Sequence, residues 1–387
     1  MTFKPARDAV LLSFVVLIAS SLGCKWRRHR VDPATSDPTT DLRAHCEGRT
    51  GLPSPLPVCT RASPCADLKH ATVDEPEQPP PSCSPKRGKS FQAYDGPPLT
   101  WNDPSSGVST QRACVYRPPG ASPSKPRALL VFLHGSGGNA DHMYDLTELR
   151  EKAETSSLSG GSGDPGFFLA SAQGRNLHFP HKWFDGPHWD TYFRDFGAES
   201  LNPDVRAIDH VIDSVASGGA VDPKRIYIMG WSNGAFFAHA YGIARSVTPT
   251  PGHHYVAAVV GFAGGDPFSG IQDGESPSCA LATYPRSDVP ILDVHRACDS
   301  LVACDEAQRE KFHLPPGNPV ESWLTTYAEK VGHTRPTEIL LDQRDQRVTS
   351  CMSADECGEV RGLAGHVMWP KDIEPSMLEF LATHPRK

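Results

Sequence analysis

Apolar residues from about residue 91 onward fall into short continuous runs that alternate with amphipathic stretches. Between residues 203 and 215 the apolar side chains recur every three or four positions, which predicts a helix capped by Asn202 with Pro203 in its first turn. The continuous runs have the length of buried strands and lie at residues 128–133, 167–170, 225–229, 255–262 and 289–294. Such strands, separated by amphipathic helices, indicate an α/β fold with a mostly parallel central sheet and helices on both faces.

Other segments complete the prediction of one folded domain over residues 91–387. Residues 112–116 are typical of an early edge strand, and residues 235–241 form a helical stretch without proline or β-branched residues. Two further helices are expected at residues 321–331 and 375–383. A single α/β domain of roughly 300 residues is common, so the length does not require a second domain.

The segment at residues 25–90 has a different amino-acid composition. Many of the 37 prolines lie before residue 130, and this segment has few long apolar side chains. Such a stretch cannot bury enough apolar surface to offset its ordering entropy, so we expect a largely disordered tether. It also carries four cysteines, which leave a small disulfide-stapled knot as the alternative: Cys46, Cys59, Cys65 and Cys83.

The first 24 residues have the pattern of an export signal. Lys4 and Arg7 precede an apolar run at residues 9–22, which is short for a membrane span and typical of a signal peptide. The run ends at Ser-Leu-Gly-Cys, which resembles a bacterial lipoprotein cleavage box with Cys24 as the lipid acceptor. We therefore expect an extracytoplasmic protein that contacts a bacterial membrane only through a lipid anchor. Cleavage by an ordinary signal peptidase, giving a secreted protein, and retention as a short membrane anchor are the alternatives.

Cysteine usage and charge narrow the classes of partner. Of eleven cysteines, ten remain when Cys24 is set aside, and disulfides are the default expectation for an exported chain. The pairs 298/304 and 351/357 are close enough in sequence for bridges, although connectivity stays open. The cysteine spacings do not match zinc sites. A net charge of −7 gives no basic footprint for nucleic acid.

The most informative motif is Gly-Trp-Ser-Asn-Gly at residues 230–234. It matches the G-x-S-x-G nucleophile elbow, in which a serine on a sharp strand-to-helix turn holds its hydroxyl clear of the sheet. The predicted strand before it and the predicted helix after it supply the context that this motif needs. Both glycines remove side chains that would crowd the turn. The motif therefore predicts Ser232 as a nucleophile.

A serine nucleophile needs a base, and that base needs an orienting carboxylate. In α/β-hydrolases these groups follow the serine in the order acid, then histidine. Asp299 comes just after the predicted strand 289–294, at the strand end where catalytic groups collect in open α/β sheets. His366 follows Gly362 and Gly365, so we expect it on a loop. These two residues are the predicted acid and general base.

The acid has competitors. Asp266 also follows a strand and is the second choice, whereas Asp293 lies inside its strand and Asp305 is typical of a solvated carboxylate. The histidines at 178, 181 and 188 form a cluster, but their spacing matches no standard metal site. We therefore expect neither a metal nor a cofactor.

The negative oxygen of a tetrahedral intermediate needs N–H donors that are already in place. One is expected from the main chain of Asn233, because the first N–H groups of a helix have no partner within the helix. The other should come from the loop His-Gly-Ser-Gly-Gly at residues 134–138, which follows a predicted strand. Ser136 is the first choice for this donor, and Gly135 is the alternative.

From about residue 110 to its end, the chain resembles the polyhydroxybutyrate depolymerase and feruloyl esterase group of α/β-hydrolases. The matching segments are LVFLHGSGGNADHM, VDPKRIYIMGWSNGAFFAH, VPILDVHRACD and GHVMWP. The resemblance implies an α/β-hydrolase fold with Ser232, His366 and Asp299 as nucleophile, base and acid. It also implies polyhydroxyalkanoate-type esters, or hydroxycinnamoyl or acetyl esters of polysaccharides, as substrates. The chain departs from the group at the acid loop, where Arg296 follows His295 in place of glycine.

The combined expectation is an exported serine esterase acting on a small or polymeric ester. A serine peptidase or acyltransferase on the same fold is one alternative, and a surface lipoprotein that uses the fold only for binding is another. The aromatic stretch at residues 181–189 has two equal interpretations, an acyl or aryl pocket or an insertion packed on the sheet.

Overall fold

The computed structural model describes part of the chain, and all of that part belongs to the unit Arg49–Lys387. Among the described residues no helix is both long and apolar enough to cross a membrane. The predicted signal at residues 1–24 with Cys24, and the predicted helix at residues 321–331, lie outside the described residues. The described residues are 72–73, 77–85, 95–159, 165–178, 186–191, 202–247, 254–265, 267, 287, 289–296, 337–341, 366 and 369–387.

An eight-stranded sheet organises the unit in the order β11-β10-β9-β8-β4-β5-β3-β2. The neighbours from β11 through β5 pair in parallel, whereas β3 and β2 join antiparallel. This arrangement confirms the predicted α/β fold with a mostly parallel sheet. The strands are β2 (Leu99–Trp101), β3 (Gln111–Tyr116), β4 (Arg127–Leu133), β5 (Phe168–Ala172), β8 (Val221–Trp231), β9 (Ala258–Phe262), β10 (Ile291–Arg296) and β11 (Thr337–Leu341).

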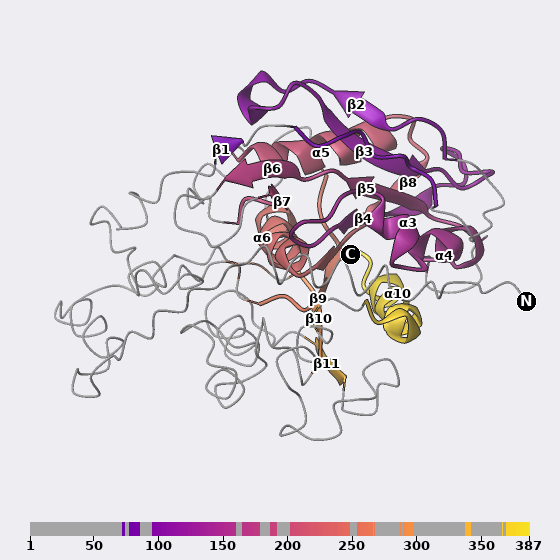
Figure 1. Cartoon of the computed structure of the whole chain (residues 1–387). Helices are drawn as coiled ribbons and strands as arrows, with labels where there is room; N and C mark the ends of the chain where they lie inside the picture. The colour runs from indigo at the N-terminus through magenta and orange to yellow at the C-terminus, as the bar shows by residue number, and fades with distance from the viewer. Residues whose placement is uncertain are drawn as a thin grey trace, which may run out of the picture. The chain divides into compact units, whose positions relative to one another are not determined.

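Helices cover both faces of the sheet (Figure 1). Alternate side chains of β4 point to opposite faces, as the pleat of a strand requires. Leu130 and Phe132 pack with one group of helices, and Leu129 and Val131 pack with the other. The first group is α3 (His142–Asp145), α4 (Leu149–Thr155) and α10 (Glu374–Thr383); the second is α5 (Pro203–Ala216) and α6 (Asn233–Val247).

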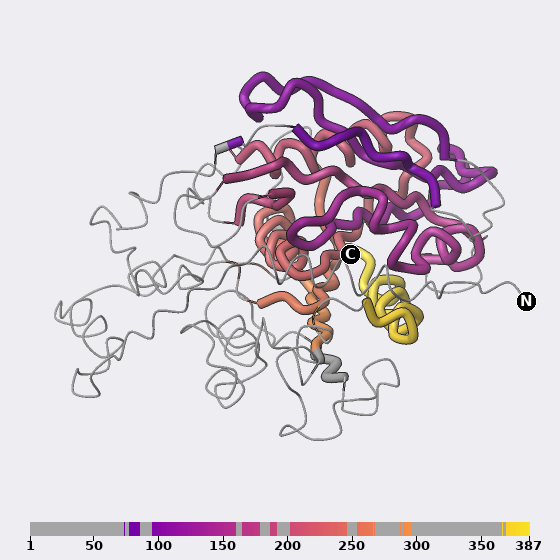
Figure 2. The backbone as a smooth tube through the Cα atoms, in the orientation of Figure 1, coloured from indigo at the N-terminus to yellow at the C-terminus, as the bar shows by residue number. Residues whose placement is uncertain are grey.

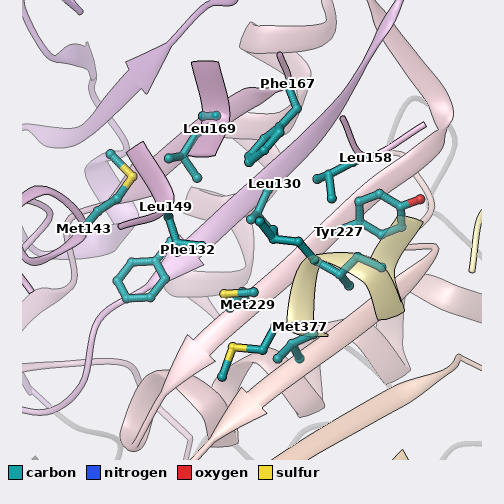
Figure 3. Packing of buried hydrophobic residues seen from close by; sticks show 14 of the residues in the cluster. Leu130, Phe132, Met143, Leu149, Leu158, Phe167, Leu169, Tyr227, Met229 and Met377 are labelled. Atoms are coloured by element: carbon teal, nitrogen blue, oxygen red, sulfur yellow. The ribbon is translucent and has the colours of Figure 1, made fainter. Parts of the chain in front are cut away.

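On the face of the sheet that carries α10, one hydrophobic cluster includes side chains from α3, α4 and α10. Figure 3 shows Leu130 and Phe132 of β4 among Met143, Leu149 and Met377, which come from α3, α4 and α10. All five side chains are fully buried. Full burial of such side chains stabilises a fold by about 1.5–3 kcal/mol each. The yellow C-terminal segment in Figure 2, which is α10, is thereby fixed to the sheet and packs on β9.

Helix α5 confirms the predicted helix and its cap. The side chain of Asn202 accepts a hydrogen bond from the Asp204 N–H at 2.9 Å, and Pro203 occupies the first turn. A buried ion pair then ties α5 to α6, since Asp209 accepts from Arg245 Nη2 at 2.6 Å and from the Tyr241 hydroxyl at 2.7 Å. Helix α6 carries the predicted site at its first residue, so this pair helps to fix the site's position.

Residues 77–85, called the N-terminal strap below, belong to the folded unit although they fall within the predicted tether. Cys83 forms a disulfide with Cys114 of β3. The Asp141 carboxylate accepts from the N–H groups of Ser82 and Cys83, both at 2.8 Å. The folded unit therefore begins before residue 91. The strap is attached by a disulfide and polar hydrogen bonds, which an analysis of apolar burial does not detect. The close cysteine pairs 298/304 and 351/357 lie outside the described residues.

Several strands differ from the sequence prediction. The predicted edge strand is β3, and it is not an edge, because β2 pairs on its outer side. Strand β2 is only three residues long and half-exposed, so its pattern is too short to detect. A separate three-stranded sheet was also not predicted. It consists of β1 (Thr72–Val73), β6 (Arg175–His178) and β7 (Gly186–His188) in the order β1-β6-β7.

Candidate active site

Ser232 lies between the end of β8 and the start of α6, as the elbow motif predicts. Its φ is +54°, in the left-handed region that a residue with a side chain rarely adopts. Its N–H donates to the Phe262 carbonyl at 2.8 Å, and its own carbonyl accepts from Ala235 N–H at 2.7 Å. These main-chain bonds to β9 and α6 hold a strained conformation at the point where the side chain leaves the sheet.

The two glycines of the motif are required by close main-chain contacts. A Cβ at Gly234 would lie 2.3 Å from the Leu133 carbonyl oxygen, and one at Gly230 would lie 2.1 Å from the Gly234 carbonyl oxygen. Real Cβ atoms essentially never come this close to another heavy atom, and main-chain atoms packed inside the domain have little freedom to move away. The turn therefore depends on both glycines.

His366 contacts Ser232 directly. Its Nε2 lies 2.7 Å from Ser232 Oγ, and its side chain is buried. The main-chain carbonyl of His366 accepts a hydrogen bond from the indole Nε1–H of Trp231 at 3.1 Å. The prediction of a loop at His366 was wrong, because the residue has helical backbone geometry. Glycine lowers helix propensity by only about 1 kcal/mol, so the glycines before it do not exclude a helical turn.

The predicted acid, Asp299, lies outside the described residues, as do Asp266 and Asp305. Strand β10 ends at Arg296, so Asp299 follows the end of a parallel strand in the sequence. Asp293 is fully buried within β10, and its Oδ1 lies 3.6 Å from Nδ1 of the buried His295. Asp293 therefore lies inside its strand, as the sequence suggested.

The loop 134–138 passes directly beside Ser232. A Cβ at Gly135 would lie 3.2 Å from Ser232 Cβ. The N–H of Gly137 donates to the Pro187 carbonyl at 2.8 Å, and that of Gly138 donates to the Gly135 carbonyl at 3.0 Å. Among the described residues the N–H groups of Gly135 and Ser136 have no main-chain acceptor. Both expected choices for the second oxyanion donor therefore stay open.

The side chain of Asn233 is engaged by a residue that sequence reasoning did not single out. Its Oδ1 accepts from the Trp189 N–H at 2.7 Å, and its Nδ2 donates to the Trp189 carbonyl at 3.1 Å. The Trp189 indole is fully buried against Phe237 of α6, with 5.6 Å between ring centroids. At Trp189 the aromatic stretch 181–189 is thus packed inside the domain. The many aromatic residues of this stretch indicated that it could be buried, but they did not predict the contact with Asn233.

His134 is held neutral inside the domain. Its Nε2 accepts from the Gly174 N–H at 2.9 Å, and its Nδ1 lies 2.8 Å from the Gly135 carbonyl oxygen. Because Nε2 is an acceptor, the ring proton resides on Nδ1 and is donated to Gly135. Complete burial lowers the pKa of His134 to about 3. The ring is therefore a fixed support for the loop.

Trp231, the residue before Ser232, packs in a group of aromatic rings. The ring of Trp369 packs 5.9 Å from Trp231 and 5.5 Å from Phe262, measured between centroids. Its Nε1–H donates to Oε1 of Glu374 at 2.6 Å, and the Glu148 N–H donates to the same oxygen at 2.8 Å. Burial raises the pKa of Glu374 to about 7.

Two predictions, about metal binding and about the histidine cluster, can be compared with the described residues. Among the described residues there is no group of three or more His, Cys, Asp or Glu side chains that could hold a metal ion. Of the histidine cluster, His178 is exposed on β6 and His188 is buried on β7, while residue 181 lies outside the described part.

Comparison with known proteins adds to this geometry. A curated protein of Nocardia uniformis subsp. tsuyamanensis, named "Putative esterase NocK", is 26% identical over 271 residues. The aligned part is 65% of this chain and 64% of that protein, so the chain spans less than two thirds of this relative's length.

Solved structures of similar chains include a thermostable esterase and an S-formylglutathione hydrolase. A thermostable esterase is 20% identical with a TM-score of 0.42, covering 76% of this chain and 64% of its own. An S-formylglutathione hydrolase from Agrobacterium tumefaciens is 14% identical with a TM-score of 0.46, covering 76% of this chain and 98% of its own. A family model described as phospholipase/carboxylesterase matches residues 120–340, which is more than half of the 387-residue chain. With its α/β-hydrolase sheet and helices, the chain belongs to the phospholipase/carboxylesterase family.

Proposed function

We propose that this protein is a serine esterase that hydrolyses carboxylic esters through an acyl-enzyme on Ser232. The observation that carries the proposal is the 2.7 Å contact between Ser232 Oγ and His366 Nε2, made at a strained strand-to-helix turn. Ser232 is half-buried and lies next to a loop in which the N–H groups of Gly135 and Ser136 have no main-chain acceptor among the described residues, which is the arrangement that acyl transfer requires. Membership of the phospholipase/carboxylesterase family supports ester bonds as the target.

The reaction follows from this geometry. Ser232 Oγ attacks the ester carbonyl carbon while His366 Nε2 accepts the hydroxyl proton, giving a tetrahedral intermediate with a negative oxygen. The N–H of Asn233 and that of Ser136 or Gly135 donate to this oxygen. The intermediate collapses, and His366 returns its proton to the leaving alcohol. Water, activated by His366, then attacks the acyl-enzyme and releases the carboxylic acid. No cofactor takes part in these steps.

The third member of the proposed triad is Asp299. Its carboxylate would accept the Nδ1–H of His366, which fixes the ring tautomer and stabilises the imidazolium formed during attack. Its position after the end of β10 in the sequence supports this role. The test is Asp299→Asn, which should lower kcat by about 10⁴-fold because an amide stabilises the wrong tautomer. Asp266→Asn is the matched control and should retain activity.

The substrate class that we propose is narrower than the family. The motifs of this chain resemble those of polyhydroxybutyrate depolymerases and feruloyl esterases, so polyhydroxyalkanoate-type esters or hydroxycinnamoyl and acetyl polysaccharide esters are the expected substrates. A panel of short-chain, aryl and polymeric esters distinguishes these classes by their kcat/KM values. Higher kcat/KM on simple short-chain esters than on all of these classes would contradict the narrower proposal.

We also propose that the protein is exported and anchored through a lipid on Cys24. The apolar run at residues 9–22 and the following Ser-Leu-Gly-Cys support this location. Processing in cells should stop in the presence of globomycin, and Cys24→Ser should release the protein from the membrane fraction. Globomycin-resistant processing would contradict lipidation and favour ordinary secretion.

The direct test of the mechanism compares wild type with Ser232→Ala. Activity on every ester should fall by at least 10⁴-fold, because the remaining groups cannot form the acyl-enzyme. A fluorescent phosphonate should label wild type and not the variant. Ser217→Ala, at an exposed serine after α5, is the matched control and should behave as wild type in both assays. Hydrolysis by Ser232→Ala at the wild-type rate would refute the mechanism.

A further inference from the structure

We propose that Trp189 is a positioning residue that links the two halves of the oxyanion hole. The inference rests on the proposed function, since it assigns a role within the same site. One half is the first turn of α6, which supplies the Asn233 N–H. The other half is the loop 134–138 after β4, which supplies the Ser136 or Gly135 N–H. Trp189, just after β7, contacts both.

The link to the first half uses the main chain of Trp189. Its N–H donates to Asn233 Oδ1 at 2.7 Å, and its carbonyl accepts from Asn233 Nδ2 at 3.1 Å. This two-point contact fixes both the position and the orientation of the amide side chain. Asn233 is the first residue of α6, so the contact helps to hold the start of the helix in place. The direction of the Asn233 N–H depends on that position.

The link to the second half uses the side chain. The Trp189 indole Nε1–H donates to the His134 carbonyl at 2.9 Å. His134 is the residue directly before Gly135, and the same peptide unit that presents this carbonyl also carries the Gly135 N–H. A second bond reinforces the link two residues further on, where the Gly137 N–H donates to the carbonyl of Pro187. The β7 segment therefore holds the loop on both sides of Ser136.

The Trp189 segment is itself anchored. Its indole stacks on Phe237, and the next residue is fixed to the start of α5. The Asp190 N–H donates to Asp204 at 2.6 Å, and Asn202 donates to the Asp190 carbonyl at 3.0 Å. Asp204 also pairs with the buried Arg175 at 2.7 Å. Trp189 can thus act as a rigid spacer between the two donors.

Rigidity matters because oxyanion donors stabilise the transition state only within a narrow distance. They must lie about 2.7–3.1 Å from the negative oxygen, and loss of one donor lowers kcat by about 10²–10³-fold. If the loss of the Trp189 contacts lets the two donors move slightly apart, kcat should also fall, but by less than when a donor is lost. Among the described residues no hydrogen bond joins Trp189 to Ser232, so its loss should affect kcat with little change in KM.

The first experiment removes the indole donor by Trp189→Phe. We expect kcat to fall by about tenfold with KM within twofold of wild type. Butylboronic acid, which forms a tetrahedral adduct with the serine, should bind more weakly by a similar factor. Trp101→Phe is the matched control, because Trp101 stacks on His210 in α5 and its ring does not touch the site. This control should retain the wild-type kcat and boronate affinity.

A second variant keeps the packing intact if Trp189→Phe fails to fold. Incorporation of 3-benzothienylalanine at position 189 replaces the indole N–H by sulfur with nearly unchanged shape, and it should give the same loss of kcat at an unchanged melting temperature. Wild-type kcat and boronate affinity in this variant would overturn the proposal.

A double-mutant cycle tests the coupling itself. Asn233→Ala removes the amide that holds the Trp189 main chain. If both variants loosen one spacer, their effects on kcat will be less than multiplicative when combined. Fully multiplicative effects would overturn the linkage. Ser232→Ala separates the two proposals, because activity that survives in Ser232→Ala refutes the esterase mechanism, whereas unchanged kcat at position 189 with an inactive Ser232→Ala refutes only the role of Trp189.

Discussion

The two sides of Ser232 are held by different means. On the side of the loop 134–138, called the oxyanion side for its proposed role, the main chains of β4, β8 and α6 pack too closely for a side chain, because a Cβ added at Gly230 or Gly234 would lie 2.1–2.3 Å from a carbonyl oxygen. On the histidine side, His366 and its neighbour Trp369 are held through indole N–H donors of Trp231 and Trp369, the second of which ends on a buried carboxylate. An added side chain cannot be accommodated where main chains pack closely, so its effect is large. A substitution that removes one side-chain hydrogen bond has a smaller, graded effect. The two sides should therefore respond differently to substitution and to pH.

The largest expected effect is on the glycine side, from Gly234→Ala. Its Cβ would meet two carbonyl oxygens, of Leu133 and His134, at 2.3 and 2.5 Å. Overpacking typically costs about 1–3 kcal/mol and occasionally more, and against main chain it should shift Ser232 as well. We expect little soluble protein, or soluble protein with activity below about 0.1% of wild type, because small misplacements at a reacting centre have large effects on rate. Thermal melting and ester hydrolysis measure both.

Gly218→Ala is the matched control for this substitution. No atom lies within 4 Å of a Cβ built at Gly218, and its φ is not in the left-handed region. The variant should have wild-type activity and equal or slightly higher stability, since alanine restricts the unfolded chain. Near-normal activity of Gly234→Ala would show that the elbow tolerates movement, and the contrast between the two sides would then be lost.

The oxyanion side also has covalent support from the N-terminal strap. Asp141, which accepts two N–H groups of the strap, lies directly before α3 in the segment that continues the loop 134–138. Replacing both Cys83 and Cys114 by serine removes a crosslink with a sequence separation of 31. The entropy of that loop predicts a loss of roughly 3–4 kcal/mol in the free energy of unfolding. Chemical denaturation checks the value, and an unchanged midpoint would contradict it.

The strap marks the limit of what the sequence predicted about the fold. Apolar periodicity placed the central strands and helix α5, because burial on both faces leaves a clear local signature. The strap attaches through Cys83 and Asp141, which are 58 residues apart in sequence, and a pairing at that distance has no local signature. Strand β2 was missed for another reason, since three half-exposed residues carry too little pattern.

The site divides in the same way. The contact between Ser232 and His366 was predictable because each lies in a short motif, and the structure brings Ser232 Oγ and His366 Nε2 to 2.7 Å. The part proposed for Trp189 was not predictable, because it depends on contacts with Asn233 and His134, which lie 44 and 55 residues away in sequence. Residues that react have local motifs, whereas residues that position them act through the tertiary structure.

A pH-dependent effect is expected on the histidine side, from Glu374→Gln. Burial raises the pKa of Glu374 from 4.5 to about 7, and Glu148 and Lys152 are the charged groups nearby, with opposing effects. Because the folded-state pKa lies above the unfolded value, the stabilising contribution is complete below pH 4.5 and is lost as the pH rises through 7. Glutamine keeps the acceptor for Trp369 and Glu148 but does not ionise.

The measurement is the free energy of unfolding of wild type and Glu374→Gln between pH 4.5 and 8.5. Relative to the variant, wild type should lose roughly 2–3 kcal/mol over this range, at about 1.4 kcal/mol per pKa unit. Glu379→Gln, at an exposed position on the same helix, is the control and should follow wild type. Parallel curves for wild type and Glu374→Gln would mean that Glu374 stays ionised, and the histidine side would then have no pH-sensitive support.

The smallest expected effect comes from Trp231→Phe, and it compares the two sides most directly. The change deletes the 3.1 Å bond to the His366 carbonyl while a ring remains to pack on Phe262 and Trp369. One neutral hydrogen bond contributes about 1 kcal/mol, so kcat should fall by no more than about fivefold. Trp189→Phe also deletes one indole hydrogen bond, yet its expected loss of kcat is larger, because it acts on donors that must lie close to the developing charge.

Boronate affinity separates the two variants. It should fall in parallel with kcat for Trp189→Phe. For Trp231→Phe it should fall less than kcat, since a displaced base slows proton transfer more than it weakens the adduct. Equal losses of boronate affinity in both variants would mean that the two sides of Ser232 are not mechanically independent.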